Sequence, residues 1–384
     1  MACAAGCGSS DAASEPSSGT AGASGSDSGL DAPDAGIDAL APETGGKETG
    51  PEAAAEAGDG PTSDAAKPDA APGCGPIVAC DAPPPDPGPK RDWRHWTSTG
   101  VVALGAPNHR GRDQFYNPGD EQWILGKIAY GLSDKDLSDE EVDLYVLRDC
   151  GTKWEKLGTT LTTTGSHPTV EGVEDNGGRV YFPIPAAQAL GLGLHRLHMV
   201  VAGDLSTTDL FVEVVAPGTP TFVSDIDGTL TPNDTEEWVT LLTGTVAEAI
   251  PDSAAALQLL ADRGYHPYYL TARPEWLTGR SREFLAQRGY PRGLLHTAVS
   301  TTGAIGSTAA TVKTADLAFL VQRGVKPIYA FGNAETDEEA YHNTGVPADH
   351  VIMINFSSPA YGSRLIGSYA ELLPEFSALP DLCP

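Results

Sequence analysis

The sequence predicts a doubly wound α/β domain in its C-terminal half, preceded by a small all-β sandwich. From residue 219 onward, apolar runs alternate with helical stretches, which is typical of a parallel sheet covered by helices. Between about residues 93 and 217 the chain shows short apolar or alternating runs separated by Gly, Pro, Asp and Asn. That second pattern is typical of antiparallel sandwiches.

Length and charge limit the classes of protein to which the chain can belong. Its 384 residues allow two or three domains, and we expect 1–90, 91–217 and 218–384 in a monomer. The net charge of -28 argues against a nucleic-acid binder, because phosphate contacts need Lys and Arg. No apolar run approaches the roughly 20 residues of a transmembrane segment.

Residues 1–90 are rich in Ala, Gly, Pro, Ser, Asp and Glu and contain no Phe or Tyr and no Trp. Such a composition cannot bury enough apolar surface to offset its ordering entropy, so we expect a disordered acidic tether. Ala4-Ala5-Gly6-Cys7 resembles the end of a bacterial lipoprotein signal, which would make the protein an exported cell-envelope lipoprotein with a lipid anchor at Cys7. The charged and apolar regions of such a signal are missing upstream, so either the true start lies further upstream or the match is accidental.

The six cysteines form no CxxC motif and no Cys/His cluster, which gives no indication of zinc. Cys74 and Cys80 could close a small disulfide loop, or they could be two unrelated thiols. Cys150 could pair with Cys383 across domains.

The sandwich is expected from six runs: Val101–Leu104, Gln122–Tyr130, Val142–Arg148, Val180–Ile184, His195–Val201 and Leu210–Val215. Their pattern resembles immunoglobulin-like accessory modules. Trp154 and Leu157 could pack inward between two of these runs. No catalytic cluster is evident, and we interpret five scattered histidines as structural or exposed: His95, His109, His167, His195 and His198.

The α/β half divides into strands and helices. A glycine directly after a basic residue, such as Gly264 after Arg263, marks the C-terminal end of a helix. The expected strands are Phe222–Asp225, Pro267–Thr271, Leu294–His296, Pro327–Phe331 and, as the last, Val351–Ile354. The expected helices are Thr235–Leu242, Asp252–Arg263, Pro274–Arg288, Lys313–Gln322 and Glu335–Asn343.

Two aspartates, Asp225 and Asp227, follow the first of these strands, and Gly228 then allows a tight turn. Two crowded carboxylates repel, and one tends to stay protonated unless a cation lies between them. Oxygen ligands in a small site suggest Mg²⁺. The alternative is a surface turn, since Asp-Gly is a common turn pair.

Polar residues also follow the other strands, at the edge where doubly wound sheets place their sites. The second strand leads into Thr271, Ala272 and Arg273, and a later strand leads into Gly332-Asn-Ala-Glu-Thr-Asp337. Lys313 opens a helix, with Lys326 as an alternative.

This order of motifs resembles the haloacid-dehalogenase superfamily. Within it, Ser224–Thr231, Leu270–Arg273 and Ala330–Asn333 resemble the lipin-type phosphatidate phosphatases and the related LNS2-like, lipid-sensing domain of phosphatidylinositol-transfer proteins. The resemblance covers roughly residues 219 to 375. It implies a phosphatase that forms an aspartyl-phosphate.

The resemblance also implies roles for single residues. Asp225 would be the nucleophile and Asp227 the general acid and base, while Lys313 would neutralise charge. Substrate phosphate would be bound by a second group: Gly228, Thr271, Ala272 and Arg273. Mg²⁺ would be held by Asp225, the backbone carbonyl of Asp227, and Asn333 or Asp337.

About 40 residues separate Thr229 from Thr271, and about 40 separate Thr271 from Lys313. The expected helices and the short strand occupy both segments, which leaves no room for a large lid domain. An open site suits a bulky or membrane-bound phosphate ester better than a small sugar phosphate. We therefore expect a Mg²⁺-dependent phosphomonoesterase, with phosphatidate as a candidate substrate. The alternative is a non-catalytic phospholipid-binding module, against which the intact Asp225 argues. The absence of an evident basic amphipathic helix argues against phosphatidate.

Overall fold

The computed structural model describes residues 78–233, 245–300, 302–304 and 306–382. The expected helix Thr235–Leu242 lies outside the described residues, as do Cys7, Cys74 and Cys383. Over the described part of the chain, no helix has the length and apolar character needed to cross a membrane.

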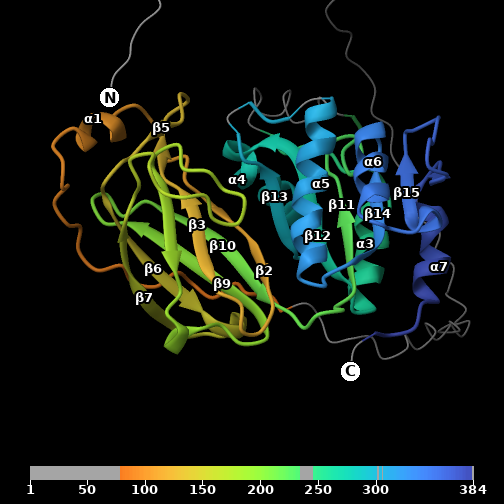
Figure 1. The fold of residues 1–384 in the computed structure, drawn as a ribbon, viewed down its shortest axis with the longest axis horizontal. Helices are drawn as coiled ribbons and strands as arrows, with labels where there is room; N and C mark the ends of the chain where they lie inside the picture. Colours follow the sequence, from red (N-terminus) through yellow and green to blue (C-terminus); the bar gives the residue numbers. More distant parts are fainter. Residues whose placement is uncertain (1–77, 234–244, 301, 305, 383–384) are drawn as a thin grey trace, which may run out of the picture. The chain divides into compact units, whose positions relative to one another are not determined.

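The first half is a β-sandwich, as predicted (Figure 1). Its larger sheet has the order β2-β10-β9-β6-β7 and is antiparallel except where β2 runs parallel to β10. Its smaller sheet has the order β1-β3-β8, and β4 and β5 form a separate hairpin. The strands are β1 Arg110–Arg112, β2 Gln114–Tyr116, β3 Trp123–Lys127, β4 Ala129–Tyr130, β5 Lys135–Asp136, β6 Glu141–Leu147, β7 Trp154–Leu161, β8 Arg179–Pro183, β9 Gly193–Val201 and β10 Thr207–Val214.

Two features of the sandwich differ from the sequence prediction. The run Val101–Leu104 is not a strand, since its first two residues belong to helix α1 (Ser98–Val102) and the other two form a turn. Val101 and Val102 pack against the core of the sandwich. A short apolar run does not distinguish a strand from a helical turn. The strands β1, β2 and β7 were not expected, because the first two are short and charges interrupt the third.

A disulfide joins Cys80 to Cys150, so neither pairing considered from the sequence, Cys74 with Cys80 or Cys150 with Cys383, is correct. Cys80 is 2% exposed. The end of the expected tether, from Val78 on, is therefore fixed to the sandwich at Cys150, the last residue of the 3₁₀ turn (Arg148–Cys150) that follows β6. The fold decides this pairing, because cysteines far apart in the sequence become neighbours.

His109 is structural, and the structure predicts a pH dependence for it. Its Nδ1 accepts from the Ala129 backbone N–H at 3.3 Å, and its Nε2 lies 2.8 Å from the Ser206 hydroxyl. Burial lowers the pKa of His109 to about 4. Below about pH 6.5 the imidazole is protonated in the unfolded chain but stays neutral in the folded chain, so lower pH favours unfolding. The contribution of neutral His109 to stability is therefore complete above about pH 6.5 and is lost as the pH falls toward 4.

We expect the free energy of unfolding to fall between pH 7 and 4.5, and His109→Gln to reduce that fall by about 2–3 kcal/mol. Urea unfolding at the two pH values measures it. His342→Gln is the control, because His342 is exposed. Equal pH dependence in wild type and His109→Gln would contradict the assignment.

The second half is an α/β domain with a six-stranded parallel sheet, in the order β13-β12-β11-β14-β15-β16. β10 ends at Val214 and β11 begins at Thr221, and we propose the domain boundary between them. The strands are β11 Thr221–Ser224, β12 His266–Pro274, β13 Leu294–Ala298, β14 Pro327–Gly332, β15 Val351–Ile354 and β16 Arg364–Ile366.

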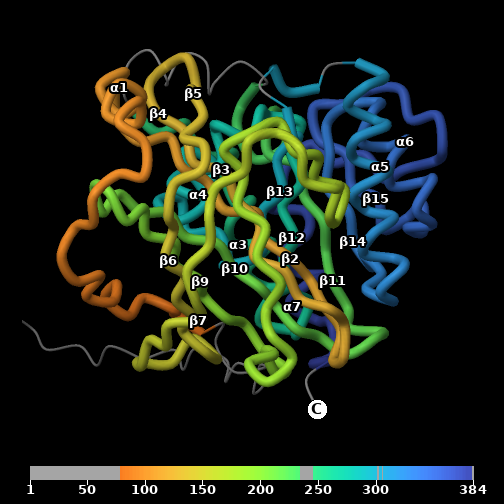
Figure 2. The backbone as a smooth tube through the Cα atoms, turned by 60° about the vertical axis from the view of Figure 1, so that its left-hand side comes forward, coloured from red at the N-terminus to blue at the C-terminus, as the bar shows by residue number. Residues whose placement is uncertain are grey.

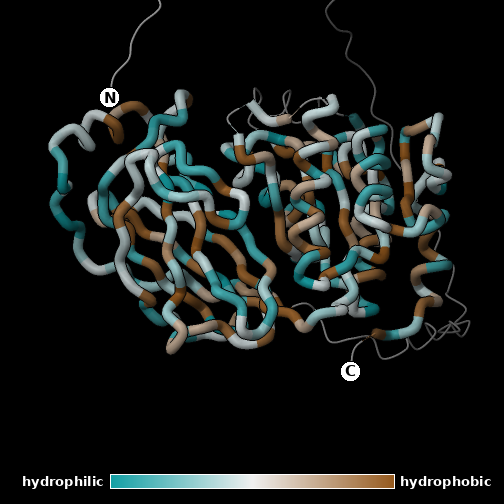
Figure 3. Tube along the Cα trace, viewed as in Figure 1, coloured by the Kyte–Doolittle hydropathy of each residue, from teal (hydrophilic) through white to brown (hydrophobic). Residues whose placement is uncertain are grey.

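Helices cover both faces of this sheet (Figures 1 and 2). Phe284 of α4, Leu257 of α3 and Phe376 of α7 share one apolar core, whereas Leu317 of α5 and Tyr341 of α6 belong to another. The bounds are α3 Ser253–Asp262, α4 Thr278–Gln287, α5 Ser307–Gln322, α6 Glu335–Asn343 and α7 Leu373–Ser377. Figure 3 shows hydrophobic residues along the strands of both domains.

Three elements of the α/β half differ from expectation. The helix predicted for Pro274–Arg288 begins with a 3₁₀ turn, Glu275–Leu277, and continues as α4. α5 begins at Ser307 rather than at Lys313, and its first turns contain two strong helix formers, Ala309 and Ala310. β15 is not the last strand, since β16 pairs with it.

The two domains share an apolar core. Phe115 and Phe211 of the sandwich belong to the same cluster as Leu317 of α5. The rings of Phe115 and Tyr268, which lies on β12, are 5.9 Å apart. The sandwich therefore packs against the α5 side of the parallel sheet.

Candidate active site

The two expected aspartates lie at the carboxyl end of β11, in the middle of the sheet. Asp225 is 3% exposed, and its backbone N–H donates to the carbonyl of Phe331 on β14 at 3.0 Å. Gly228 has φ 69°, which lets the chain turn away after the aspartates. The strand end thus directs a buried carboxylate toward the edge where the neighbouring strands also end.

Lys313 reaches Asp225 from α5. Its Nζ donates to Oδ1 of Asp225 at 2.7 Å and to Oδ1 of Asp337. All three side chains are buried. Lys326, the alternative lysine, is exposed, so Lys313 is the one that meets the aspartate.

Asp337 also organises the turn after β14. Its Oδ2 accepts from the backbone N–H groups of Asn333 and Ala334 at 3.1 and 3.2 Å, which satisfies donors at the start of α6. A Cβ at Gly332 would lie 2.5 Å from the Cβ of Asp337, so only glycine fits there. Both carboxylate oxygens of Asp337 are therefore engaged.

Asp227 is held by the end of β12. Arg273 donates from Nη2 to Oδ1 at 2.7 Å and from Nε to Oδ2 at 2.8 Å, and Thr271 donates to Oδ2 at 3.2 Å. Arg273 also donates to the Ser281 hydroxyl at 3.0 Å. A two-point contact of this kind is among the stronger hydrogen-bonded ion pairs. The general acid and base expected from the sequence is thus clamped by an arginine.

Thr229 was not assigned a role from the sequence, yet it joins two parts of the site. Its hydroxyl lies 3.2 Å from Oδ2 of Asp225 and 3.1 Å from Oδ1 of Asn333. A hydroxyl has one hydrogen, so it can donate to only one of these oxygens at a time. Its position inside Asp-Gly-Thr was the available signal.

The site is short of positive charge. Burial raises the pKa of Asp225 to about 7, and Asp337 and Asp227 add to this effect while Lys313 opposes it. Burial alone would lower the pKa of Lys313, but its two aspartate partners raise it above the ordinary value. One ammonium between two buried carboxylates leaves a negative charge without compensation.

A pocket of about 310 Å³ opens above these groups. Its lining includes polar residues of the site together with small apolar ones: Asp225, Asp227, Ala272, Arg273, Pro274, Leu277, Thr302, Ala304, Gly306, Ala309, Lys313, Asn333, Ala334, Thr336 and Asp337. Thr271 and Gly228 were expected to bind substrate, but they are not part of this lining. The Thr271 hydroxyl instead donates a hydrogen bond to Asp227.

A magnesium ion fits this donor set only through mixed ligands. Among the residues that the structure describes, no three His, Cys, Asp or Glu side chains gather in a way that would hold a metal. Oxygens of Asp225 and Asn333 nevertheless face the same hydroxyl of Thr229. One carboxylate, one amide and one backbone carbonyl are ligands that Mg²⁺ accepts, with water and phosphate completing its shell.

Two family models match the chain. The model described as "PITM 1-3, LNS2 domain" matches residues 222–355, and the model described as "PITM 1-3, beta-sandwich domain" matches residues 107–214. The first match spans the Asp225 strand and the Asn333 turn. The C-terminal domain has a haloacid-dehalogenase-like fold. We refer to it below as the HAD-like domain, and the predicted fold class is confirmed.

Curated relatives match the chain at modest identity. Protein retinal degeneration B of Drosophila melanogaster is 28% identical over 269 residues, which are 69% of this chain and 20% of that protein. Membrane-associated phosphatidylinositol transfer protein 1 of Homo sapiens is 29% identical over 209 residues, which are 54% of this chain and 15% of that protein. The matches thus cover about a fifth or less of these relatives' length.

Solved structures give weaker likenesses. A class C acid phosphatase from Bacillus anthracis with tungstate bound has a TM-score of 0.25 and 19% identity, over 31% of this chain and 54% of that one. A phosphoserine phosphatase from T. onnurineus has a TM-score of 0.28 and 14% identity, over 43% of this chain and 98% of that one. Both scores are low, and nothing below rests on these two structures.

The expectation of an exported bacterial lipoprotein is wrong. Protein retinal degeneration B and the similar human and mouse proteins come from animals, and the human and mouse ones are named membrane-associated phosphatidylinositol transfer proteins. The signal-like stretch around Cys7 is short and consists of common small residues, so it is weak evidence for export.

Proposed function

We propose that the HAD-like domain is a Mg²⁺-dependent phosphomonoesterase that works through an aspartyl-phosphate. One observation carries the proposal: the buried Asp225 faces a pocket of about 310 Å³, with the Lys313 ammonium 2.7 Å from one of its oxygens. A carboxylate held in this way is placed to attack, and the lysine offsets charge on the phosphate.

The reaction has two balanced steps. An oxygen of Asp225 bonds to phosphorus, the bond from phosphorus to the ester oxygen breaks, and Asp227 gives a proton to the leaving alkoxide. Water then attacks the same phosphorus while Asp227 takes back a proton. Inorganic phosphate leaves and the Asp225 carboxylate is restored.

Arg273 must release Asp227 for this chemistry, because a carboxylate clamped by an arginine is a poor proton donor. Arg273 lines the pocket, so a substrate phosphate can compete for its guanidinium. Substrate binding would thus free the general acid.

The residues that would hold the ion are Asp225, Asn333 and the backbone carbonyl of Asp227. When bound, Mg²⁺ would polarise the phosphoryl oxygens and compensate the extra negative charge of the site. In this arrangement Asp337 holds Lys313 and the start of α6.

A phospholipid monoester such as phosphatidate is the proposed substrate class. Two observations support it: the match to an LNS2 domain, and the apolar residues Ala272, Pro274, Leu277 and Ala304 beside the charged groups. In this proposal the phosphate would lie among the charged groups, and the hydrocarbon would lie against the apolar residues of the lining.

The direct test is release of inorganic phosphate by the full-length chain. Phosphatidate in mixed micelles and p-nitrophenyl phosphate serve as substrates, each with Mg²⁺ and with a chelator. We expect release with Mg²⁺ that the chelator abolishes. Release no faster than that of Asp225→Asn on both substrates would refute the enzyme.

A second candidate function is a phospholipid-binding module without turnover, which the Arg273–Asp227 clamp favours. The human relative is also named as a phosphatidylinositol transfer protein rather than a phosphatase. Sedimentation with vesicles that contain phosphatidate, without phosphate release, is the expected result for this candidate. Absence of any preference for phosphatidate over phosphatidylcholine vesicles would remove it.

Arg273→Gln distinguishes a phosphate ligand from a purely structural arginine. We expect the KM for p-nitrophenyl phosphate to rise roughly 10-fold, because a hydrogen bond from a charged group to phosphate is lost. The matched control is Arg292→Gln, an exposed arginine outside the pocket lining. An unchanged KM in steady-state kinetics would contradict a role for Arg273 in binding phosphate.

A further inference from the structure

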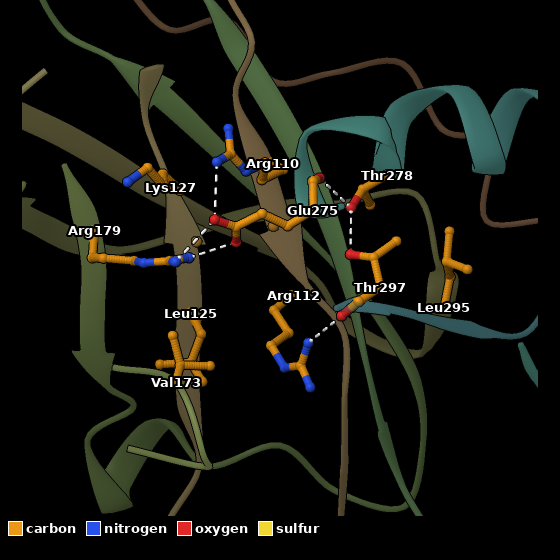
Figure 4. A pocket seen from close by; sticks show the side chains of 12 residues that line it. Arg110, Arg112, Leu125, Lys127, Val173, Arg179, Glu275, Thr278, Leu295 and Thr297 are labelled. Atoms are coloured by element: carbon orange, nitrogen blue, oxygen red, sulfur yellow. Dashed lines mark hydrogen bonds and ion pairs between the residues drawn. The ribbon is translucent and has the colours of Figure 1, made fainter. Parts of the chain in front are cut away.

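Three arginines of the sandwich, Arg110 and Arg112 of β1 and Arg179 of β8, reach into the HAD-like domain (Figure 4). We call them the interdomain arginine cluster. Arg110 and Arg179 are 4% and 3% exposed. Residues two apart on a strand point to the same side, so the short strand β1 presents two guanidinium groups together.

The first arm of the cluster ends on Glu275. Arg179 donates to its two oxygens at 2.7 and 2.9 Å, and Arg110 donates to Oε1 at 3.0 Å. Burial would raise the pKa of Glu275, but the two arginines outweigh burial and lower it. The carboxylate is therefore ionised and held from two strands of the sandwich.

Glu275 directly continues the strand end that carries Arg273. It follows Arg273 by two residues, and its backbone N–H donates to the carbonyl of Ser300 at 3.2 Å. Its own carbonyl accepts from the hydroxyl of Thr278 at 2.7 Å. Any shift of Glu275 must therefore move the segment that clamps Asp227.

Further contacts lead back to β1, as Figure 4 shows. The hydroxyls of Thr278 and Thr297 are 3.1 Å apart, and the carbonyl of Thr297 accepts from Arg112 at 3.2 Å. Arg110 and Arg112 thus hold the two ends of one chain of hydrogen bonds.

The second arm of the cluster ends on α5. Arg112 donates to Oδ2 of Asp316 at 3.0 Å, and the Tyr268 hydroxyl donates to Oδ1 at 2.8 Å. Burial would raise the pKa of Asp316, but His296 and Arg112 outweigh it, so the pKa lies well below its usual range. Asp316 lies three residues after Lys313, hence on nearly the same face of the helix.

We propose that the interdomain arginine cluster positions the two cationic groups of the active site, Arg273 through Glu275 and Lys313 through Asp316. No member of the cluster lines the active-site pocket, so its members are positioning residues. The proposal rests on the proposed function in that the pocket is where phosphate binds. The sandwich, which contributes no catalytic group, would thus fix the positions of the groups that bind phosphate and carry out the reaction.

Buried ion pairs support this interpretation. Their desolvation cost makes them weak contributors to stability, whereas their hydrogen bonds allow few alternative geometries. A placement error near 1 Å at a reacting group can cost about 10²-fold in rate. The cluster connects β12 and α5 through short contacts, so its loss should shift each cation separately.

The test uses the full-length chain with two variants. Glu275→Gln should raise the KM for p-nitrophenyl phosphate and weaken inorganic phosphate binding in calorimetry by roughly 10-fold, because Arg273 shifts. Arg112→Gln should lower kcat by roughly 10- to 100-fold, because Lys313 shifts. Arg112→Lys should recover part of kcat. Arg94→Gln, an exposed arginine paired with Asp139 inside the sandwich, should change neither value.

Loss of folded protein would lower kcat and leave KM unchanged, which differs from the result expected for Glu275→Gln. If Glu275→Gln does not fold, Arg110→Lys keeps a cation beside Glu275 and should raise KM to a smaller extent. Glu275→Gln and Arg112→Gln values equal to those of Arg94→Gln overturn the proposal. If the wild type binds phosphate but does not hydrolyse a monoester, the proposed phosphatase activity is overturned and the positioning proposal is not. Phosphate binding by the wild type and by Glu275→Gln in calorimetry then tests the positioning proposal by itself.

Discussion

Asp225→Asn should abolish phosphate release, by on the order of 10⁴-fold or more on any monoester that the wild type hydrolyses. The amide oxygen of asparagine is not a nucleophile toward phosphorus, so no covalent intermediate can form. Lys313 keeps Asp337 as its partner, so no buried cation is left alone. The loss should therefore lie in kcat, with the variant folded, and a malachite-green phosphate assay measures it.

Asp349→Asn is the matched control, because it makes the same chemical change at an exposed position outside the pocket lining. It should retain wild-type kcat. Inorganic phosphate should still bind to Asp225→Asn, since the cations of the pocket remain. Residual activity within 10-fold of wild type would mean that another group is the nucleophile.

Lys313→Met should be the most destabilising single change in the site. Methionine matches the length of lysine but leaves Asp225 and Asp337 buried without their cation. Removing one partner of a buried ion pair costs about 3–5 kcal/mol in free energy of unfolding. Phosphate release should also fall by on the order of 10²- to 10³-fold, as expected for loss of a stabilising donor.

The double variant Lys313→Met/Asp337→Asn should recover part of this stability, because one of the two repelling carboxylates is gone. Lys326→Met serves as the control, since Lys326 is exposed. Urea unfolding at pH 7 gives the free energies. Equal stability of Lys313→Met and Lys326→Met would show that the ammonium is not needed to hold the two aspartates.

The parts of the site that could be predicted from the sequence are those that depend on strand ends. Asp225 ends an apolar strand, and the carboxyl ends of parallel strands meet at one edge, so its proximity to Asn333 and Asp337 followed from topology alone. Lys313 followed from its place in the order of motifs. The structure brings all four together around one pocket.

The remaining features depend on contacts between distant segments. The clamp of Arg273 on Asp227 arises because β12 extends to Pro274, past the expected strand end, and turns the arginine back toward β11. Thr229 gains its role from Asn333, which lies more than a hundred residues later. No local periodicity indicates such pairings, because they are decided by packing across the sheet.

The helix Thr235–Leu242 lies outside the described residues, so it stays a prediction. β1 also depends on contacts with distant segments, which local sequence patterns do not indicate. Three residues with two arginines look like a solvated turn in the sequence. The acids that face them, Asp134 and Glu275 for Arg110 and Asp316 for Arg112, explain why these side chains are largely covered.

The bond between Cys80 and Cys150 also sets how far the chain can be drawn out. It closes a sequence separation of 70 residues. A pull applied before Cys80 passes through the bond to Cys150 and leaves the enclosed segment slack. That segment is about 230–250 Å of fully extended chain, which becomes available only after reduction. While the bond is intact, a load on the N-terminal part of the chain bypasses β1 and its two arginines.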